Sequence, residues 1–393
     1  MAVSAKIKEM MAGSSWIRRM FEAGQQLKAE HGADRVCDFS IGNPNLPPPA
    51  GFEKALFDIL REDIPGKHGY MPNAGYPEVR EKIAAHLSKE QGVPLRGGRV
   101  VLSCGAGGGL NVALKALLNP GDTVLASAPY FVEYAVYADN HGGSFASVRS
   151  KEDFDLDVGG IEKAVTPKTA ALIINSPNNP SGQVYPEKTV AALARMLERK
   201  SREIGRSIYL LSDEPYRKIV FDGVAVPSVF RHYKNSIIVT SCSKDLSIPG
   251  ERIGWIAVHP DADDAEDIVN ALILATRILG FVNAPALMQR AVARLIGVSV
   301  DAGIYQKKRD ILCEGLARAG YEFVKPKGTF YLLPKAPGGD ELAFVDSLAK
   351  ELILTVPGRG FGIPGHFRIA FCVEDAVIER SLEGFARAIQ KFR

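Results

Sequence analysis

One lysine, Lys244, stands among residues that could turn it into a nucleophile. Ser241 and Ser243 precede it at positions −3 and −1, and Arg252 follows eight residues later. Two hydroxyls and an arginine can bind a phosphate, which the arginine grips with parallel hydrogen bonds. The apolar run at residues 253–258 reads as a buried strand, and burial favours the neutral amine of a nearby lysine. The spacing therefore predicts a lysine Schiff base with a phosphate-bearing aldehyde such as pyridoxal phosphate.

Two polar stretches directly follow other apolar runs. The first, Asn-Ser-Pro-Asn-Asn-Pro-Ser-Gly at residues 175–182, has the composition of a plain turn. If the stretch is functional, one of its asparagine side chains donates a hydrogen bond to an oxygen on the ring of the bound cofactor. The second begins at Asp213, after the run at residues 207–212. A buried carboxylate needs a partner, and a pyridinium nitrogen would suit it, whereas the alternative is a helix N-cap.

A glycine-rich turn, Cys-Gly-Ala-Gly-Gly-Gly at residues 104–109, separates an apparent strand from a helical pattern at residues 110–118. Small residues would leave several backbone N–H groups free at the start of that helix, where anions bind. The same turn could instead hold a dinucleotide or simply pack tightly. The spacing of the third glycine and the lack of an acidic residue after the next strand disfavour a dinucleotide.

These stretches belong to a region, residues 100–260, in which short β-rich runs alternate with amphipathic segments. That alternation predicts a wound α/β sheet, in which ligands bind at the carboxyl ends of the strands. The segment at residues 186–204 is expected to be a covering helix. The seven candidate strands are residues 100–104, 123–128, 144–148, 170–175, 207–212, 236–241 and 252–258.

Beyond residue 283 the pattern changes. A long helical pattern runs to residue 319 with a possible break near Gly297, and strand and turn signals follow at residues 321–333. The last expected elements are a loop at residues 334–339, helices at residues 341–353 and up to 392, and a strand at residues 367–372. We therefore expect a large domain of residues 51–285 and a smaller α+β domain made of residues 1–50, with an N-terminal arm, and 286–393.

The composition is that of a globular protein. Its 393 residues are 46% hydrophobic and carry a net charge of +3, which gives no reason to expect a nucleic-acid or membrane partner. The five cysteines have no paired spacing, and the seven histidines have none typical of metal ligands. No signal peptide or membrane span is recognised. We expect a cytoplasmic protein without a metal site.

Together these stretches resemble the class I and II aminotransferases, a family of fold-type I pyridoxal-phosphate enzymes. The resemblance runs from Gly42-Asn43-Pro44 to Arg368. Its strongest motifs are Asn-Asn-Pro-Ser-Gly at residues 178–182, Asp-Glu-Pro-Tyr at residues 213–216, and Ser-Cys-Ser-Lys followed by Arg252. It implies a seven-stranded, mostly parallel sheet covered by helices, a smaller α+β domain, pyridoxal 5'-phosphate as cofactor, and a homodimer with active sites at the interface.

The resemblance also implies a role for each matching residue. Lys244 would carry the internal aldimine and then act as the base that moves the substrate's α-proton. Asp213 would bind the pyridine nitrogen, while Asn179 and Tyr216 would bind the phenolic oxygen. The other implied contacts are Phe131 stacked on the ring; Ala106, Gly107, Ser241, Ser243 and Arg252 around the phosphate; Tyr70 at the phosphate of the neighbouring subunit; and Arg368, with Gly42 and Asn179, around the substrate carboxylate.

Several positions depart from well-known members of the family. Phe131 replaces a frequent tryptophan, and Ala106 stands where a serine sometimes bonds the phosphate. Arg277 lies about one residue from the position of an arginine that reads a distal carboxylate, although a helix-surface arginine is the simpler interpretation. Ser15, Trp16 and Ile17 could line the side-chain pocket if the N-terminal segment folds over the site, whereas an exposed anchor for the arm explains Trp16 equally well.

The sequence therefore predicts an aminotransferase that moves the amino group of an α-amino acid to a 2-oxo acid by a ping-pong mechanism. The alternative is a lyase or synthase on the same scaffold, which would use nearly identical cofactor contacts. A third class, a transcriptional regulator with this fold fused to a DNA-binding module, fits poorly because the family pattern begins at residue 42.

Overall fold

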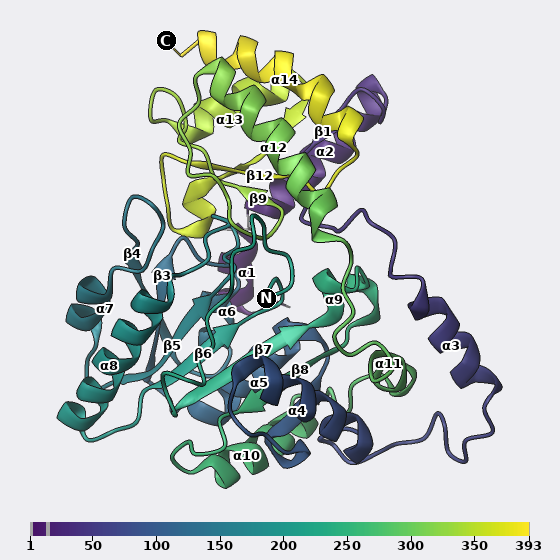
Figure 1. The fold of residues 1–393 in the computed structure, drawn as a ribbon. Coiled ribbons are helices and arrows are strands. Elements are labelled where there is room, and N and C mark those ends of the chain that lie inside the picture. The colour runs from purple at the N-terminus through teal and green to yellow at the C-terminus, as the bar shows by residue number, and fades with distance from the viewer. Residues whose placement is uncertain (1–2, 13–15, 393) are drawn as a thin grey trace.

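A seven-stranded sheet forms the centre of the molecule (Figure 1). The structure, a computed structural model, describes residues 3–12 and 16–392. The strands are β2 (Val100–Ser103), β3 (Thr123–Ala128), β4 (Ser144–Arg149), β5 (Thr169–Asn175), β6 (Tyr209–Asp213), β7 (Ser236–Ser241) and β8 (Gly254–Val258). Their order is β2-β8-β7-β6-β5-β3-β4, and β8 runs opposite to the other six strands, which are parallel to one another. The predicted mostly parallel sheet is confirmed.

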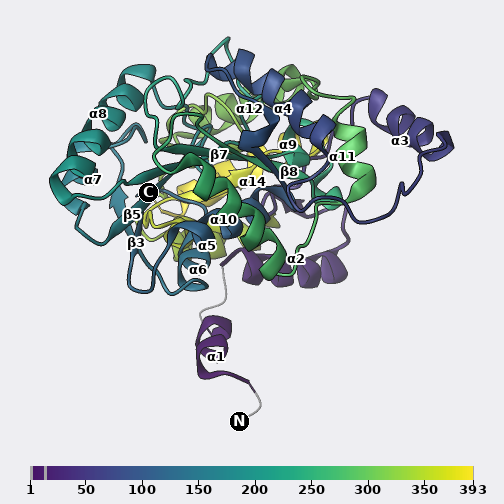
Figure 2. The same cartoon turned by 90° about the horizontal axis from the view of Figure 1, so that it is seen from below.

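The sheet has helices on both faces. They include α4 (Pro77–Gln91), α5 (Gly105–Leu117), α6 (Tyr134–Asp139), α7 (Val158–Ala164), α8 (Glu187–Ile204) and α10 (Ala265–Ile278). Successive strand residues point to opposite faces, so Leu172 packs in a cluster with α4 and α8, while Ile173 packs in another with α5 and α10. Figure 2 shows α5 and α10 along one face of the sheet, and α1 (Ala5–Ala12) outside these layers. Burial on both faces explains why inner strands such as β5 and β7 are largely apolar runs, whereas the edge strand β4 is mostly exposed.

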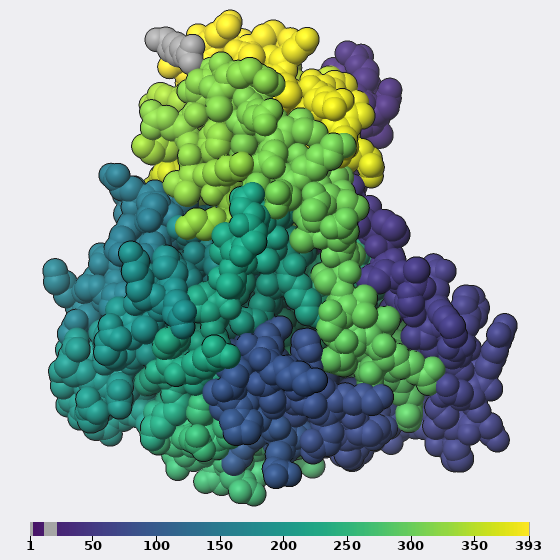
Figure 3. Space-filling model, in the orientation of Figure 1, coloured from purple at the N-terminus to yellow at the C-terminus, as the bar shows by residue number. Residues whose placement is uncertain are grey.

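A smaller unit lies over this layered part, drawn in green and yellow in Figure 3. Its sheet joins β9 (Tyr331–Leu332), β11 (Val356–Pro357) and β12 (Phe367–Ala370), and β1 (Cys37–Asp38) pairs with β10 (Ile353–Leu354). Its helices include α12 (Ala302–Ala319), α13 (Glu341–Lys350) and α14 (Asp375–Gln390). Phe39 of the N-terminal segment packs in the same apolar cluster as Phe385, so the first and last parts of the chain meet here.

The remaining elements link these parts. They are α2 (Trp16–His31), α3 (Gly51–Arg61), α9 (Cys242–Asp245), α11 (Ala286–Val292) and the short 3-10 turns Gly97–Arg99, Pro249–Glu251 and Gly358–Phe361. Met288 and Val292 of α11 pack in a cluster of the large sheet rather than in that of the smaller unit. The domain boundary at residue 285 stays a prediction. Within the described part of the chain, no helix is both long enough and apolar enough to cross a bilayer.

The helical pattern at residues 283–319 forms two helices, α11 and α12, and the expected break near Gly297 is confirmed, because Gly297 lies between them in the left-handed region at φ 87°. The strand signals at residues 321–333 yield only β9. The backbone N–H groups of Lys327 and Gly328 donate to Gly182 O in the loop after β5, so this segment bonds a loop instead of a neighbouring strand.

Candidate active site

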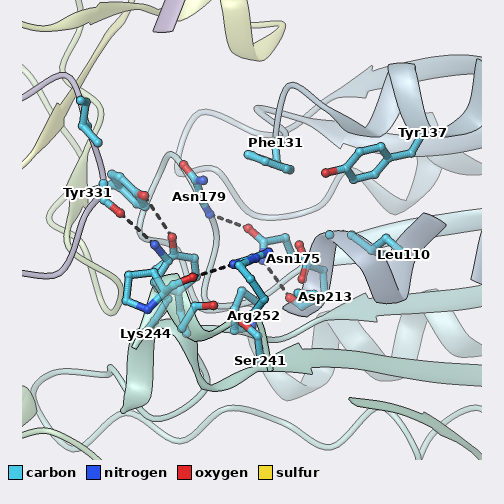
Figure 4. A pocket seen from close by; sticks show the side chains of 18 of the residues that line it. Leu110, Phe131, Tyr137, Asn175, Asn179, Asp213, Ser241, Lys244, Arg252 and Tyr331 are labelled. Carbon is cyan, nitrogen blue, oxygen red and sulfur yellow. Dashed lines mark hydrogen bonds between the residues drawn. The ribbon is translucent and has the colours of Figure 1, made fainter. Parts of the chain in front are cut away.

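A cavity of about 320 Å³ opens where β5, β6 and β7 end, beside the first turn of α5 and below the smaller unit (Figure 4). Because these three strands are parallel, their final residues Asn175, Asp213 and Ser241 reach the same edge of the sheet. The cavity brings together twelve of the thirteen predicted site residues. They are Gly42, Ala106, Gly107, Phe131, Asn179, Asp213, Tyr216, Ser241, Ser243, Lys244, Arg252 and Arg368.

Lys244 lies on α9, the single helical turn that follows β7. Its Nζ donates a 2.8 Å hydrogen bond to the carbonyl oxygen of Gly42 and lies 5.5 Å from the centre of the Phe330 ring. Burial lowers the pKa of this amine to about 8, and the positive charges of Arg368 and Arg252 act in the same direction. Roughly a tenth of the amine is therefore neutral, and nucleophilic, at pH 7, far more than for an ordinary lysine.

Asp213 ends β6, and a turn rather than a helix follows it, so the N-cap alternative is wrong. Its Oδ2 accepts a 2.6 Å hydrogen bond from the Tyr134 hydroxyl, whereas its Oδ1 is buried and has no hydrogen-bond partner among the described residues. Burial raises the pKa of this carboxyl to about 7, although the hydrogen bond from Tyr134 acts against the rise. A buried acceptor without a partner at a cavity wall suits a cationic N–H donor.

The polar loop after β5 is buried, unlike an ordinary surface turn. Asn178, Asn179 and Ser181 are each less than 10% exposed. Asn175 connects the loop to the next strand, because its Nδ2 donates to Asp213 O at 2.8 Å and its Oδ1 accepts from the backbone N–H of Asn179 at 2.6 Å. These contacts fix the backbone that carries the Asn179 side chain at the cavity wall.

Arg368 extends from β12 into the cavity from the side of the smaller unit. Its guanidinium lies between two aromatic rings, with its central carbon 4.7 Å from the centre of Tyr331 and 4.8 Å from that of Phe361. Its Nη2 donates to Ser40 O at 2.6 Å, but its Nε is buried without a partner among the described residues. No described carboxylate pairs with it, so the site holds a buried positive charge that an anionic ligand can neutralise.

The opposite end of the cavity is built to hold an anion. α5 begins at Gly105, five residues before the predicted start, so the glycines form its first turn. The N-cap residue Cys104 makes no side-chain cap, which leaves N–H groups of that turn free. The Arg252 guanidinium comes so close that a Cβ at Gly105 would lie 2.7 Å from its Nη2. Gly105 also lies in the left-handed region at φ 71°, which favours glycine, and Ser241 and Ser243 complete this wall.

The model of the family described as "Aminotransferase class I and II" matches residues 34–385. The chain belongs to this family. Among curated relatives, a "Probable aspartate/prephenate aminotransferase" from Thermus aquaticus is 32% identical, with 91% of this chain and 92% of that protein covered. A crystal structure of an amino transferase from Eubacterium rectale is 38% identical, with a TM-score of 0.97 and full coverage of both chains. The aspartate aminotransferase of Thermus thermophilus with maleate is 27% identical, with a TM-score of 0.88 over 99% of this chain and all of that one.

These likenesses confirm the predicted pyridoxal-phosphate-dependent aminotransferase and its fold type. The cavity of this aminotransferase also fits that cofactor. Its walls offer a reactive amine at Lys244, an unpartnered buried carboxylate oxygen at Asp213, and an anion-binding turn beside Arg252. Those three features match the aldehyde, the ring nitrogen and the phosphate of pyridoxal phosphate.

Some of the predicted residues lie elsewhere. Tyr70 is 93% exposed and does not line the cavity, so its action on a neighbouring subunit stays a prediction. Arg277 is exposed on α10, outside the cavity wall. Ser15 and the side chains of Trp16 and Ile17 lie outside the described residues. In the described part of the chain, no group of three or more histidine, cysteine, aspartate or glutamate side chains could hold a metal ion.

Sequence reasoning missed several residues of the aminotransferase site. Asn175 had a usable signal, since it ends a predicted strand directly before the polar loop. Tyr134 had a weaker one, because it follows Phe131 by three residues. Tyr137 and Tyr331 line the cavity but stand in segments without any polar motif.

Proposed function

We propose that Lys244 is the residue that binds pyridoxal phosphate and that the cavity around it transfers the amino group of an α-amino acid to a 2-oxo acid. The observation that carries this proposal is the presence, in one cavity, of the Lys244 amine and the unpartnered Oδ1 of Asp213. When bound, the cofactor supplies an aldehyde carbon and an electron-accepting ring. Binding, orientation and proton transfer are left to side chains and backbone groups of the protein.

The Lys244 amine would be the nucleophile that holds the cofactor's aldehyde carbon, and it would also be the base that takes the proton from the substrate's Cα. Its lowered pKa suits both tasks, because the neutral amine is accessible near pH 7. The Asp213 carboxylate would bind the protonated ring nitrogen, which would make the ring a better electron acceptor. Asn179 and Tyr216 would bind the ring oxygen, and Phe131 would stack on the ring.

Arg368 binds the substrate's α-carboxylate. Its planar fork can make two parallel hydrogen bonds, which fix the orientation of the Cα–H bond that breaks. Gly42 lies at the same wall, where a side chain would leave no room for Tyr331. The phosphate would be held by Ala106, Gly107, Ser241, Ser243 and Arg252, and by Tyr70 of a second subunit.

The proposed assembly is a cytoplasmic homodimer without nucleic-acid or membrane partners, divided into domains of residues 51–285 and of residues 1–50 with 286–393. Exposed apolar side chains support a protein partner. Phe57 and Leu60 on α3 are 59% and 52% exposed, and Leu274 and Ile278 on α10 are 48% and 55% exposed. Each pair is spaced to lie on one face of its helix, and apolar patches of this kind on a surface can be covered by another subunit.

The test is to mix the holoenzyme with each amino acid singly and to follow cofactor absorbance and products. Transfer predicts a change of absorbance together with one equivalent of 2-oxo acid, and release of a new amino acid after a second 2-oxo acid is added. A lyase would release ammonia or a thiol from one substrate. Lys244→Ala is expected to lose the lysine-bound absorbance and all turnover. An active Lys244→Ala enzyme that keeps this absorbance would refute the assignment.

A further inference from the structure

Tyr331 lies between the two halves of the site. It belongs to β9, which pairs with the strand β12 that carries Arg368. Its side chain, labelled in Figure 4, is 3% exposed. Its hydroxyl oxygen is 3.0 Å from that of Tyr216. Its ring centre is 4.7 Å from the central guanidinium carbon of Arg368. One side chain therefore contacts both a proposed cofactor ligand and the proposed carboxylate ligand.

Tyr331 also touches the backbone that binds the reactive lysine. A Cβ placed on Gly42 would lie 1.8 Å from the Tyr331 hydroxyl oxygen, so that hydroxyl lies directly against the glycine. The carbonyl oxygen of the same glycine accepts the hydrogen bond from Lys244 Nζ. Glycine at residue 42 is needed because any larger residue would displace Tyr331.

The number of available protons sets the direction of the hydrogen bond between the two tyrosines. Each hydroxyl has one proton to donate, and the Tyr331 hydroxyl makes no hydrogen bond other than that with Tyr216 among the described residues. If Tyr216 donated to Tyr331, it would have no proton left for the ring oxygen of the cofactor. Tyr216 can bind that oxygen as a donor only when Tyr331 donates to Tyr216. Hydrogen bonds in such a chain strengthen one another.

We propose that Tyr331 is a positioning residue whose hydroxyl donates to Tyr216, so that Tyr216 directs its own proton to the cofactor's ring oxygen, while the Tyr331 ring holds Arg368 in place. This inference rests on the proposed function, which assigns the roles of Tyr216 and Arg368. It separates two contributions of one side chain, because the hydroxyl serves the cofactor and the ring serves the substrate.

The hydroxyl is tested by titrating the absorbance of the lysine-bound cofactor in the Tyr331→Phe holoenzyme. A donor to the ring oxygen stabilises negative charge there, which makes the neighbouring lysine-derived nitrogen release its proton more readily. Weaker donation from Tyr216 should therefore raise the midpoint pH, on the order of half a pH unit. The KM for the amino acid should change less than about twofold, because phenylalanine keeps the ring under Arg368.

The ring is tested by Tyr331→Leu. Loss of the aromatic face should raise KM roughly 2- to 30-fold, as expected for a buried cation–π contact, in addition to raising the midpoint pH. Tyr305→Phe is the matched control, because Tyr305 is also buried and lies against Phe330 but does not line the cavity. Its titration and KM should match those of the wild type, as should the melting temperatures of the phenylalanine variants.

The decisive comparison places Tyr331→Phe in a Tyr216→Phe background, where the proposed chain has already lost its second member. The effect of Tyr331→Phe on the midpoint should then vanish. An unchanged midpoint in the single variant, or an equal rise in both backgrounds, would overturn the inference while leaving the wild-type aminotransferase intact. A wild-type protein without lysine-bound absorbance would instead overturn the proposed function, and this inference with it.

Discussion

Tyr134 donates its hydroxyl proton to Oδ2 of Asp213 at 2.6 Å, and both side chains are buried. The bond occupies one carboxylate oxygen and leaves Oδ1 facing the cavity without a partner among the described residues. It also opposes the effect of burial, because it lowers a carboxyl pKa that desolvation raises. Tyr134 therefore both orients the carboxylate and favours the ionised form that a protonated ring nitrogen requires.

Removal of this hydroxyl should slow the chemical step. Hydrogen bonds to charged groups contribute about 1.5–3 kcal/mol, so Tyr134→Phe should lower kcat roughly 10- to 100-fold. Cofactor affinity should fall less, because the phosphate contacts remain. Single-turnover kinetics with one amino acid measure the step directly. Tyr233→Phe is the control, since it deletes a buried hydroxyl that donates to Ile208 O away from the cavity. Equal rates for the two variants would contradict the role of Tyr134.

The same carboxyl makes the stability of the cofactor-free protein depend on pH. Burial raises its pKa from the usual 3.8 to about 7 in the folded protein. At a pH between these two pKa values, the Asp213 carboxyl is ionised in the unfolded chain but stays protonated in the folded protein. The folded protein therefore loses stability as pH rises, by roughly 1.4 kcal/mol per pH unit from pH 5 to pH 7, and the loss ends as the folded carboxyl ionises.

Asp213→Asn removes this titration. The unfolding free energy of the cofactor-free variant, relative to that of the cofactor-free wild type, should therefore rise between pH 5 and pH 8, as measured by urea denaturation. Asp122→Asn serves as the control, because Arg206 binds that carboxylate with two 2.6 Å hydrogen bonds and lowers its pKa. The Asp122 carboxylate is fully ionised at pH 5 in both the folded and the unfolded chain. The unfolding free energy of Asp122→Asn, relative to that of the wild type, should therefore stay constant from pH 5 to pH 8. A flat difference for Asp213→Asn would show that Asp213 is ionised in the empty site.

Much of this site was predictable because its residues end apolar runs. Asp213 and Ser241 close the strands β6 and β7, and parallel strands bring such ends together without any knowledge of side-chain packing. Tyr134 and Tyr331 could not be found this way. Their hydroxyls bond to Asp213 and Tyr216, which lie 79 and 115 residues away in the sequence. Each contact depends on how a covering helix or the smaller unit packs on the sheet, which local patterns do not specify.

The geometry of Arg368 predicts that a lysine cannot replace it. Its guanidinium lies between the rings of Tyr331 and Phe361, and its free Nε is available to a ligand. A lysine keeps the charge but loses the planar fork and the stacking. Arg368→Lys should raise KM for the amino acid roughly 10- to 100-fold, with a small change in kcat at saturation. Arg359→Lys, which alters a pair with Glu341 outside the cavity, should leave KM unchanged. Equal KM values for Arg368→Lys and the wild type would exclude the carboxylate contact.

The exposure of Tyr70 predicts that each active site is completed by a second copy of the chain. Tyr70 lies 93% exposed and outside the cavity of its own chain, whereas Lys244 lies inside it. If Tyr70 binds the phosphate of its neighbour, the two residues of one site come from different subunits. A hybrid of Tyr70→Ala and Lys244→Ala subunits then contains one site with both residues intact and one with neither.

Such hybrids form when the two differently tagged variants are unfolded, mixed, refolded and purified through both tags. The purified hybrid should recover about half of the wild-type kcat at cofactor concentrations where both parent dimers are poorly active, because one of its two sites is complete. Refolded parent variants, treated separately, are the controls for the procedure. If Tyr70 served its own chain, every site in the hybrid would lack either Tyr70 or Lys244, and its activity would not exceed the average of the parents.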